Sequence, residues 1–333
     1  MIVCCGEALV DMVPDRDAFL ARPGGCPFNT AVAAARLGAR CAFLGRIGKD
    51  FLGDLLAGKL RESGVDLSMT VRSDQPATLA FVHREHNGDA RYAFYSNGAA
   101  DRSLESADLP ASLGDEARFL MVGSISMLQE PAASTIESLV ARESRKLLVS
   151  LDPNVRPGLI PGRVSYLQRF SRWAAMSSIV KVSSDDLEWL WPGRSVEDCA
   201  RELLALGPEL VVVTLGSDGS AAFLRESRVG RSASAWAVGF AVAVADTIGA
   251  GDTFHASLLA SLDAAGIHDR PGLGGLSEGW LRGALDRANA AAALDCTRAG
   301  ADPPTAGELE AFIRERSVGS GGISSLSSWR GKK

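Results

Sequence analysis

Residues 244–254 contain the residue types and spacing best suited to a chemical step, Val-Ala-Asp-Thr-Ile-Gly-Ala-Gly-Asp-Thr-Phe. They follow a β-rich run and lead into a predicted helix, residues 253–265. Gly249, Ala250 and Gly251 have little or no side chain, so an anion can approach their backbone closely. Their amides, together with that of Asp252, would lie at a helix N-terminus, where the partial positive charge favours a phosphate.

Asp252 lies where this anion site would meet an acceptor hydroxyl. A carboxylate there can accept the proton of the attacking hydroxyl while the amides stabilise charge on the transferring phosphoryl group. An aspartate after a glycine-rich turn is also a common helix N-cap. The short motif alone favours neither interpretation, because short motifs match many unrelated chains.

A second glycine motif lies far upstream and joins the pair Gly24 and Gly25 to a predicted helix. Asp11 lies near the end of the first predicted strand, and Asn29 follows the glycine pair. In a parallel sheet these elements can meet at the carboxyl edge, where α/β proteins bind ligands. Asp11 and Asn29 suit a polyol, because a carboxylate accepts from hydroxyls and an amide both donates and accepts. The glycine pair also fits an ordinary turn.

The elements that must position these residues follow from the hydrophobic pattern. The predicted strands are residues 2–13, 42–47, 119–122, 147–151, 179–182 and 210–215. The predicted helices are residues 29–37, 51–63, 132–143, 196–206, 253–265 and 281–294. This alternation predicts an α/β fold whose mostly parallel sheet is covered on both faces. Residues 77–84 and 91–96, joined through Asn87 and Gly88, predict an appended β-hairpin that could act as a lid.

Composition excludes several classes of protein. The chain has 333 residues, 46% of them hydrophobic, and a net charge of −5 from 35 basic and 40 acidic residues. A nucleic-acid or anionic-membrane surface is therefore disfavoured. The N-terminus lacks the basic start of an export signal, and no apolar stretch is long enough to cross a membrane. The six cysteines show no Cys-x-x-Cys pairing, so we expect free thiols and a cytoplasmic location.

With both glycine motifs in this order, the chain resembles the ribokinase-like (PfkB) carbohydrate kinases over residues 2–305. One family signature lies within residues 25–48 and the other within residues 246–252. Further segments are similar to bacterial fructokinases in particular: residues 6–11, 91–95, 151–156 and 298–304. The resemblance implies a three-layer α/β/α ribokinase-like fold with a small β lid. It also implies transfer of the ATP γ-phosphate to the 6-hydroxyl of fructose.

The resemblance implies a role for each motif residue. Asp252 would be the base, and the anion hole would consist of Gly249, Ala250 and Gly251. The implied sugar site consists of Asp11, Gly24, Gly25, Asn29 and Arg156. The implied ATP site consists of Lys181, Thr214, Gly216, Gly219 and Asn289.

Mg²⁺ and K⁺ are the metal ions that the resemblance implies. Asp246 and Ile248 match a K⁺-type site, where backbone carbonyls supply much of the coordination. The family often has Asn-x-x-Glu, which organises Mg²⁺ through water, whereas this chain has Ser183 and Asp186 at those positions. An outer-sphere role for Asp186 is compatible with this change, because Mg²⁺ usually keeps several waters.

The predicted organisation is one kinase domain, residues 1–316, with a lid from about 12–23 and 77–104. A Ser- and Gly-rich tail, residues 317–333, is predicted to be disordered. A homodimer formed through the lid is a further expectation, and His255 is expected to have a packing or surface role. The acceptor stays open: 2-keto-3-deoxygluconate is the main alternative to fructose. A catalytically inactive sugar-binding regulator is an alternative of a different class.

Overall fold

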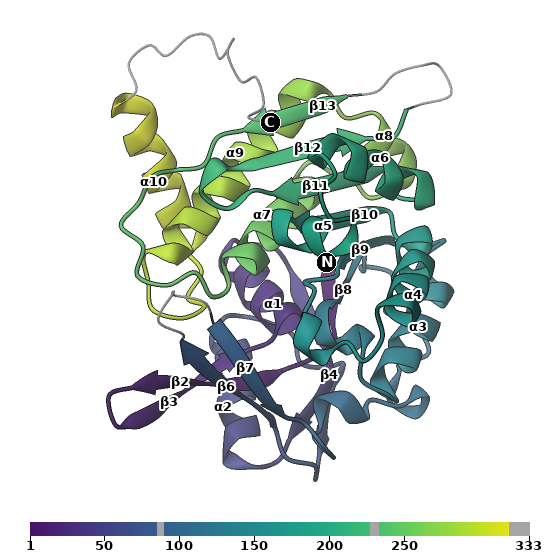
Figure 1. Ribbon diagram of the computed structural model, residues 1–333, viewed down its shortest axis with the longest axis vertical. Helices are drawn as coiled ribbons and strands as arrows, with labels where there is room; N and C mark the ends of the chain where they lie inside the picture. Colours follow the sequence, from purple (N-terminus) through teal and green to yellow (C-terminus); the bar gives the residue numbers. More distant parts are fainter. Residues whose placement is uncertain (85–89, 227–232, 320–333) are drawn as a thin grey trace.

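Two sheets organise the chain in the computed structural model, which describes residues 1–84, 90–226 and 233–319 (Figure 1). The larger sheet has nine strands in the order β13-β12-β11-β10-β9-β8-β1-β4-β5. Its strands are β1 (Ile2–Cys5), β4 (Cys41–Gly48), β5 (Thr70–Ser73), β8 (Phe119–Gly123), β9 (Leu148–Asp152), β10 (Ile179–Ser183), β11 (Leu210–Thr214), β12 (Ser220–Leu224) and β13 (Ser234–Ala237). All neighbours from β5 to β11 pair in parallel, whereas β12 and β13 are antiparallel additions at one edge.

Helices cover both faces of this sheet, so the predicted three-layer arrangement is confirmed (Figure 1). One face packs against α1 (Cys26–Arg36), α2 (Phe51–Glu62), α7 (Ala250–Ala264), α8 (Arg270–Gly274), α9 (Glu278–Cys296) and α10 (Ala306–Gly319). The other packs against α3 (Ala132–Glu143), α4 (Arg163–Met176), α5 (Ser184–Leu190) and α6 (Val196–Leu206). The first four residues of β11 are apolar and buried, because both faces of this central strand are covered by helices.

Five short 3₁₀ helices complete the described elements: Asp101–Ser103, Ser106–Asp108, Ser124–Met127, Pro157–Leu159 and Gly216–Asp218. No helix among the described residues is both long and apolar enough to cross a membrane.

The smaller sheet has four strands in the order β3-β2-β6-β7 and lies beside the main body (Figure 1). Its strands are β2 (Leu9–Asp15), β3 (Ala18–Gly24), β6 (Thr78–Arg84) and β7 (Ala90–Tyr95). β6 and β7 pair antiparallel, which confirms the predicted hairpin, although its turn at Asn87 and Gly88 lies outside the described residues. The β2–β3 hairpin, which projects from the body in Figure 1, completes the predicted appendage.

Three predictions about elements were wrong. The strand expected at 2–13 is two strands in different sheets, because the chain turns at Gly6, where φ is 148°. A Cβ at Gly6 would lie only 2.7 Å from the Pro27 side chain, so glycine permits this close turn. The motif near residue 250 follows irregular backbone, residues 238–249, rather than a strand. Helix α10 runs to Gly319, past the expected boundary at 317, and residues 320–333 lie outside the described part of the chain.

Candidate active site

The start of α7 forms an open set of backbone donors. Gly249 is the N-cap with φ 85°, a left-handed conformation that favours glycine, and the helix begins at Ala250. The first intrahelical bond runs from the Thr253 amide to the Gly249 carbonyl (2.8 Å), and the Ala250 amide donates to Thr247 (3.3 Å). Within the described residues, no backbone acceptor faces the amides of Gly251 and Asp252. Two of the expected anion-hole amides are therefore available, whereas that of Ala250 is occupied.

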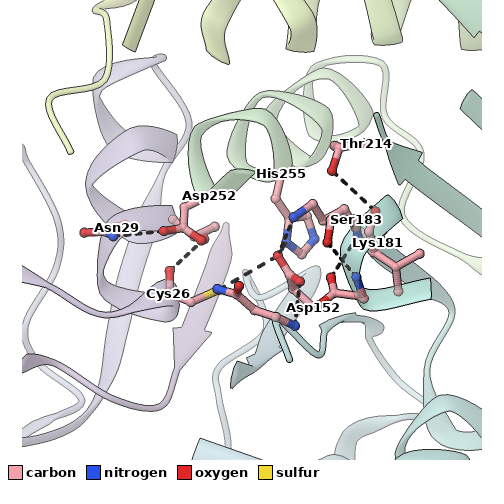
Figure 2. A network of polar contacts seen from close by, with 12 residues as sticks. Cys26, Asn29, Asp152, Lys181, Ser183, Thr214, Asp252 and His255 are labelled. Carbon is pink, nitrogen blue, oxygen red and sulfur yellow. Dashed lines mark hydrogen bonds and ion pairs between the residues drawn. The ribbon is translucent and has the colours of Figure 1, made fainter. Parts of the chain in front are cut away.

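Asp252 lies in the first turn of α7 with 7% of its surface exposed. Its Oδ2 accepts a hydrogen bond from the Asn29 side-chain amide at 2.9 Å (Figure 2). Burial and the nearby Asp152 raise the pKa of Asp252 to about 6, although Asn29, Cys26 and Lys181 act in the opposite direction. A carboxylate with this pKa is ionised near neutral pH yet basic enough to accept a proton.

Helix α1 brings Asn29 to this carboxylate. The helix begins at Cys26, three residues before the predicted start, because Pro27 fits the first helical turn and needs no hydrogen-bond acceptor for its nitrogen. Gly25 is the N-cap at φ 109°, and a Cβ there would lie 2.8 Å from the Glu7 carbonyl oxygen. The Cys26 amide donates to Glu7 Oε1 (3.1 Å), which fixes the helix start against the turn after β1. Asn29 was expected at the sugar site, and the structure places its side chain against the predicted base.

Asp11 and Gly24 lie diagonally across the β2–β3 pair, where their register partners are Arg22 and Leu9. A Cβ on Gly24 would overlap an oxygen of the Asp11 carboxylate, so glycine leaves the space that this side chain occupies. Burial raises the pKa of Asp11 to about 7, and Asp252 and Asp246 add to the increase against the opposing effect of Arg156. Asp11 is therefore a buried hydrogen-bonding group on the wall opposite α7.

A buried ion pair lies beside the base. Lys181 Nζ is 2.9 Å from Asp152 Oδ2, with the two side chains 5% and 0% exposed (Figure 2). A Cβ on Gly251 would lie 3.1 Å from Lys181 Nζ, so this ammonium group lies next to the free amides of α7. Burial lowers the pKa of Lys181, but Asp152 and Asp186 more than offset this, so the ammonium stays charged.

His255 lies behind this pair and is completely buried, which confirms the expected packing role. Its Nε2 is 2.6 Å from Ser150 Oγ, and its Nδ1 is 3.9 Å from Asp152 Oδ2 (Figure 2). Burial, with a smaller contribution from Lys181, lowers the pKa of His255 to about 3, so the ring is neutral. A neutral ring here packs beside Asp152 without adding charge.

These side chains surround a cavity of about 240 Å³ between the two sheets and α7. The predicted site residues that line it are Asp11, Gly25, Asn29, Arg156, Lys181, Ile248, Gly249, Gly251 and Asp252. Gly24, Ala250, Asp186, Asp246 and the remaining predicted ATP residues do not line it. The cavity therefore brings the predicted base, anion hole and sugar residues together.

The remaining ATP residues lie farther along the same sheet edge. Thr214 ends β11 and pairs in register with Ser183 of β10, two residues after Lys181. Gly219 has φ 107°, and a Cβ there would overlap the carbonyl oxygen of Ala237. Asn289 donates to the carbonyls of Ala237 (3.2 Å) and Val238 (3.3 Å), so it joins α9 to the chain leaving β13. Gly216 lies in open space at φ 59°.

The two carboxylates expected at metal ions have structural partners. Asp186 forms a capping box with Ser183, accepts from the Val155 amide (2.7 Å) and is 5% exposed. Burial and Asp152 raise the pKa of Asp186 against the effects of Lys181 and Ser183. Asp246 accepts from the amides of Ile248 (3.2 Å) and Gly300 (3.1 Å), and so joins two loops.

Several residues that line the cavity were not among the predicted site residues. Glu7, Cys26, Ser124 and Phe94 belong to this set. Glu7 was visible in sequence only as an acid beside the first strand, and Cys26 as one of six thiols. Ser124 has φ 58°, a conformation that no sequence pattern in its neighbourhood indicates. The inward direction of Phe94 depends on how the small sheet docks, which strand alternation alone cannot determine.

Comparison with known proteins identifies the group to which this site belongs. A model described as "pfkB family carbohydrate kinase" matches residues 1–306. A fructokinase of Rhizobium leguminosarum bv. trifolii is 41% identical over 292 residues, which cover 86% of this chain and 87% of that protein. The crystal structure of fructokinase from Xylella fastidiosa with bound ATP has a TM-score of 0.86 at 29% identity and covers 95% of this chain and 98% of that one.

A second solved structure is similar to nearly the same extent. Fructokinase from Vibrio cholerae O395 in its fructose-, ADP- and calcium-bound form has a TM-score of 0.80 at 29% identity, with 94% of this chain and 98% of that chain covered. The family match extends over nearly the whole described chain, and both glycine motifs lie within it. On this basis the chain belongs to the pfkB family of carbohydrate kinases.

Proposed function

We propose that this protein is a fructokinase that transfers the γ-phosphate of ATP to the 6-hydroxyl of D-fructose. The observation that carries the proposal is the position of Asp252, whose carboxylate lines the cavity beside two free helix-start amides. The relatives named fructokinase, and the Vibrio cholerae structure with fructose and ADP, support fructose as the acceptor.

In the proposed phosphoryl transfer, each group around the cavity has a separate role. The 6-hydroxyl gives its proton to Asp252, and the oxygen attacks the γ-phosphorus. The bond from that phosphorus to the bridging oxygen of the β-phosphate breaks, so ADP leaves. The amides of Gly251 and Asp252 and the Lys181 ammonium stabilise the negative charge on the phosphoryl group as it moves.

The two substrates would lie on opposite sides of Asp252. The sugar would contact Asp11, Asn29 and Arg156 beneath the small sheet, which acts as the lid and keeps water from the phosphoryl group. ATP would lie along the sheet edge, with Lys181 at its phosphates; the other residues proposed to form its site are Thr214, Gly216, Gly219 and Asn289. Asn289 then acts on the adenine side by fixing the backbone at Ala237 and Val238.

Mg²⁺ fits this site as a hydrated ion held mainly by the ATP phosphates, where it would neutralise phosphate charge. The carboxylate oxygens of Asp186 already accept the amides of Ser183 and Val155, so its proposed contribution is through water. The relatives solved with calcium and potassium ions support the presence of metal sites.

A K⁺-type site is proposed at Asp246 and Ile248. The Asp246 carboxylate satisfies the amides of its own turn, and among the described residues no donor reaches the Ile248 carbonyl oxygen. A carbonyl oxygen without a donor is a suitable ligand for such an ion.

Asp252→Asn tests the proposed base. We expect kcat to fall by about 10²–10⁴-fold, because the amide cannot accept the proton. The fold should persist, since the amide oxygen can still accept from Asn29 and a buried charge has been removed. Asp263→Asn, at the far end of α7, should leave kcat within twofold of the original. Near-normal turnover in the Asp252 variant would exclude this mechanism.

The acceptor is tested by measuring ADP release with ketohexoses, aldohexoses, ribose, nucleosides and 2-keto-3-deoxygluconate. A preference for the last of these would follow from a contact between its carboxylate and Arg156, which lines the cavity. Fructose should give the highest kcat/KM if the proposal is correct. Binding of sugar without any ADP release would instead indicate the regulator.

We also propose that the protein forms a homodimer through the small sheet and works in the cytoplasm, where ATP is available and free thiols persist. Phe19 and Tyr95, 49% and 65% exposed, flank Phe81 on one face of this sheet. Exposed aromatic side chains of this kind are typical of protein interfaces. A monomer in sedimentation velocity at micromolar concentration would contradict the dimer.

A further inference from the structure

Asp295, near the end of α9, is a buried carboxylate without a hydrogen-bond partner. It is 1% exposed, and neither of its oxygens has a partner among the described residues. The other buried acids of this region differ, because Asp152 pairs with Lys181 and Asp186 accepts two backbone amides. An isolated buried carboxylate is costly, so this side chain requires a positive partner or a proton.

Within residues 1–84, 90–226 and 233–319, no positively charged group is among those that act on Asp295. Besides burial, the groups that act most on its pKa are Asp252, Asp302 and Thr253, none of which carries a positive charge. The last turn of α9 also disfavours an anion, because carbonyl groups point towards it. Burial and Asp252 raise the pKa of Asp295 to about 7, against the smaller opposing effects of Thr253 and the Asp302 backbone.

The position of Asp295 indicates what kind of partner is missing. Its Oδ2 lies 3.2 Å from where a Cβ on Gly249 would be, and Ala301 borders the same point. The Cys296 carbonyl accepts the amides of Ala245 (2.8 Å) and Asp246 (3.3 Å), and Asp246 in turn accepts the Gly300 amide. Asp295 therefore lies where the loops 245–249 and 298–301 are tied together, beside the proposed K⁺-type site.

We propose that Asp295 is the anionic partner of a monovalent cation held between these two loops, so that a buried side-chain charge supplements the backbone oxygens. The inference rests on the K⁺-type site proposed above and adds a residue to it. The pairing would explain why an acid is tolerated at this buried position.

The pairing has a consequence for the neighbouring anion hole. An unpaired carboxylate behind Gly249 would oppose the negative charge that the Gly251 and Asp252 amides are placed to receive. Compensation of Asp295 by a cation removes that opposition without any contact to the substrate. Asp295 is thus a positioning residue, and its effect should be visible in the absence of both substrates.

The experiment compares the original protein with Asp295→Asn by thermal unfolding, without ATP or sugar. KCl is titrated against choline chloride at constant ionic strength, because a ligand of the folded state raises Tm with its concentration. The original protein should gain Tm with K⁺ in a saturable manner. In the Asn variant the half-saturating K⁺ concentration should rise at least tenfold, while Tm in choline chloride alone should be equal or higher.

Asp286→Asn is the matched control, because this half-buried aspartate lies about 13 Å away along α9 and should respond to K⁺ like the original. An equal K⁺ response in the Asp295→Asn variant and the original protein would overturn the role of Asp295 but not the cation site. No K⁺ response in the original protein would overturn the cation site itself, and with it this inference, but not the kinase activity. A loss of Tm in both salts would identify a structural role and overturn the proposal. If the Asn variant does not fold, the same measurement on Asp295→Ala tests whether loss of the carboxylate weakens the K⁺ response of Tm.

Discussion

Asp252 is surrounded by groups that act on its charge in opposite directions. Burial and Asp152 favour its protonated form, whereas Asn29, Cys26 and Lys181 favour the carboxylate. The balance leaves a pKa of about 6, which lies close to neutral pH. The Asp152–Lys181 pair is therefore more than a structural contact, because each partner acts on the base with the opposite sign.

Replacing Lys181 separates these two effects. Lys181→Met leaves Asp152 buried without a counter-charge, so we expect a loss of about 3–5 kcal/mol in the free energy of unfolding. In the original protein, kcat/KM should decline as pH falls through about 6, where Asp252 takes up a proton. In the variant this decline should begin at a higher pH, since a positive charge near the base has been removed.

The double variant Lys181→Met/Asp152→Asn provides the matched comparison. Removing both charges should restore most of the stability, but kcat should remain low because the ammonium near the phosphoryl group is absent. Chemical denaturation and pH–rate profiles measure the two quantities. Full recovery of kcat in the double variant would contradict the proposed contact between Lys181 and phosphate.

At the level of elements, the site depends on where helices begin. Both α1 and α7 start three residues earlier than the hydrophobic pattern predicts. Helix starts are set by caps and backbone dihedrals, such as the positive φ of Gly25 and Gly249, and apolar periodicity does not register these. The earlier start is important for the chemistry, because it places Gly251 and Asp252 in the first turn, where amides are free.

The loop after β11 offers a test at this scale. Gly219→Ala should raise KM for ATP by more than tenfold, because the added Cβ would push Ala237 and its neighbours away from the proposed nucleotide groove. KM for the sugar should change less than twofold, and enzyme kinetics with each substrate varied separately measure both. Gly114→Ala is the control, since this glycine lies outside the proposed sites, has φ 84° and its Cβ would meet no atom within 4 Å. Its cost should be limited to the left-handed conformation, about 1–2 kcal/mol. Equal effects of the two changes on KM for ATP would argue against the groove.

At the scale of the whole molecule, the alternation of apolar runs predicted a mostly parallel sheet with helices on both faces. It did not predict the contacts between side chains that form the site. Asn29 and Asp252 are 223 residues apart, and Lys181 and Asp152 belong to neighbouring strands. The resemblance to a family named most of these residues, but the pairing of Asn29 with the base depends on how α1 and α7 are rotated. The burial of Asp295 could not be predicted from the sequence, because a single acid in an otherwise apolar helix is usually assigned to the solvent-exposed face.

Stability of the whole molecule should depend on pH through its buried carboxyls. Burial raises the pKa of Asp11 and Asp101 to about 7, so their contribution is present at low pH and is lost as pH rises through that value. His255 acts in the opposite sense, but its contribution is lost only below about pH 6.5. Between pH 6.5 and 8, Tm of the protein without ligands should therefore fall, because the free energy of unfolding decreases by on the order of 1 kcal/mol for each carboxyl.

Scanning calorimetry of Asp101→Asn measures this directly. The amide can still accept the hydrogen bond from Thr78 (2.6 Å), but it does not titrate. The dependence of Tm on pH should be shallower in this variant than in the original protein. A steeper or unchanged dependence would show that Asp101 is not neutral at pH 6.5.

The small sheet is a single layer of strands, so self-association of the protein on its outer face could change the turnover rate in the cavity on its inner face. On β7, Phe94 faces the cavity and the adjacent Tyr95 faces outward, so one backbone serves both sides. A molecule that binds the exposed aromatic side chains must also restrict the movement of the strand that covers the proposed sugar site. Specific activity would then vary with dilution, even though no residue of a second molecule enters the cavity.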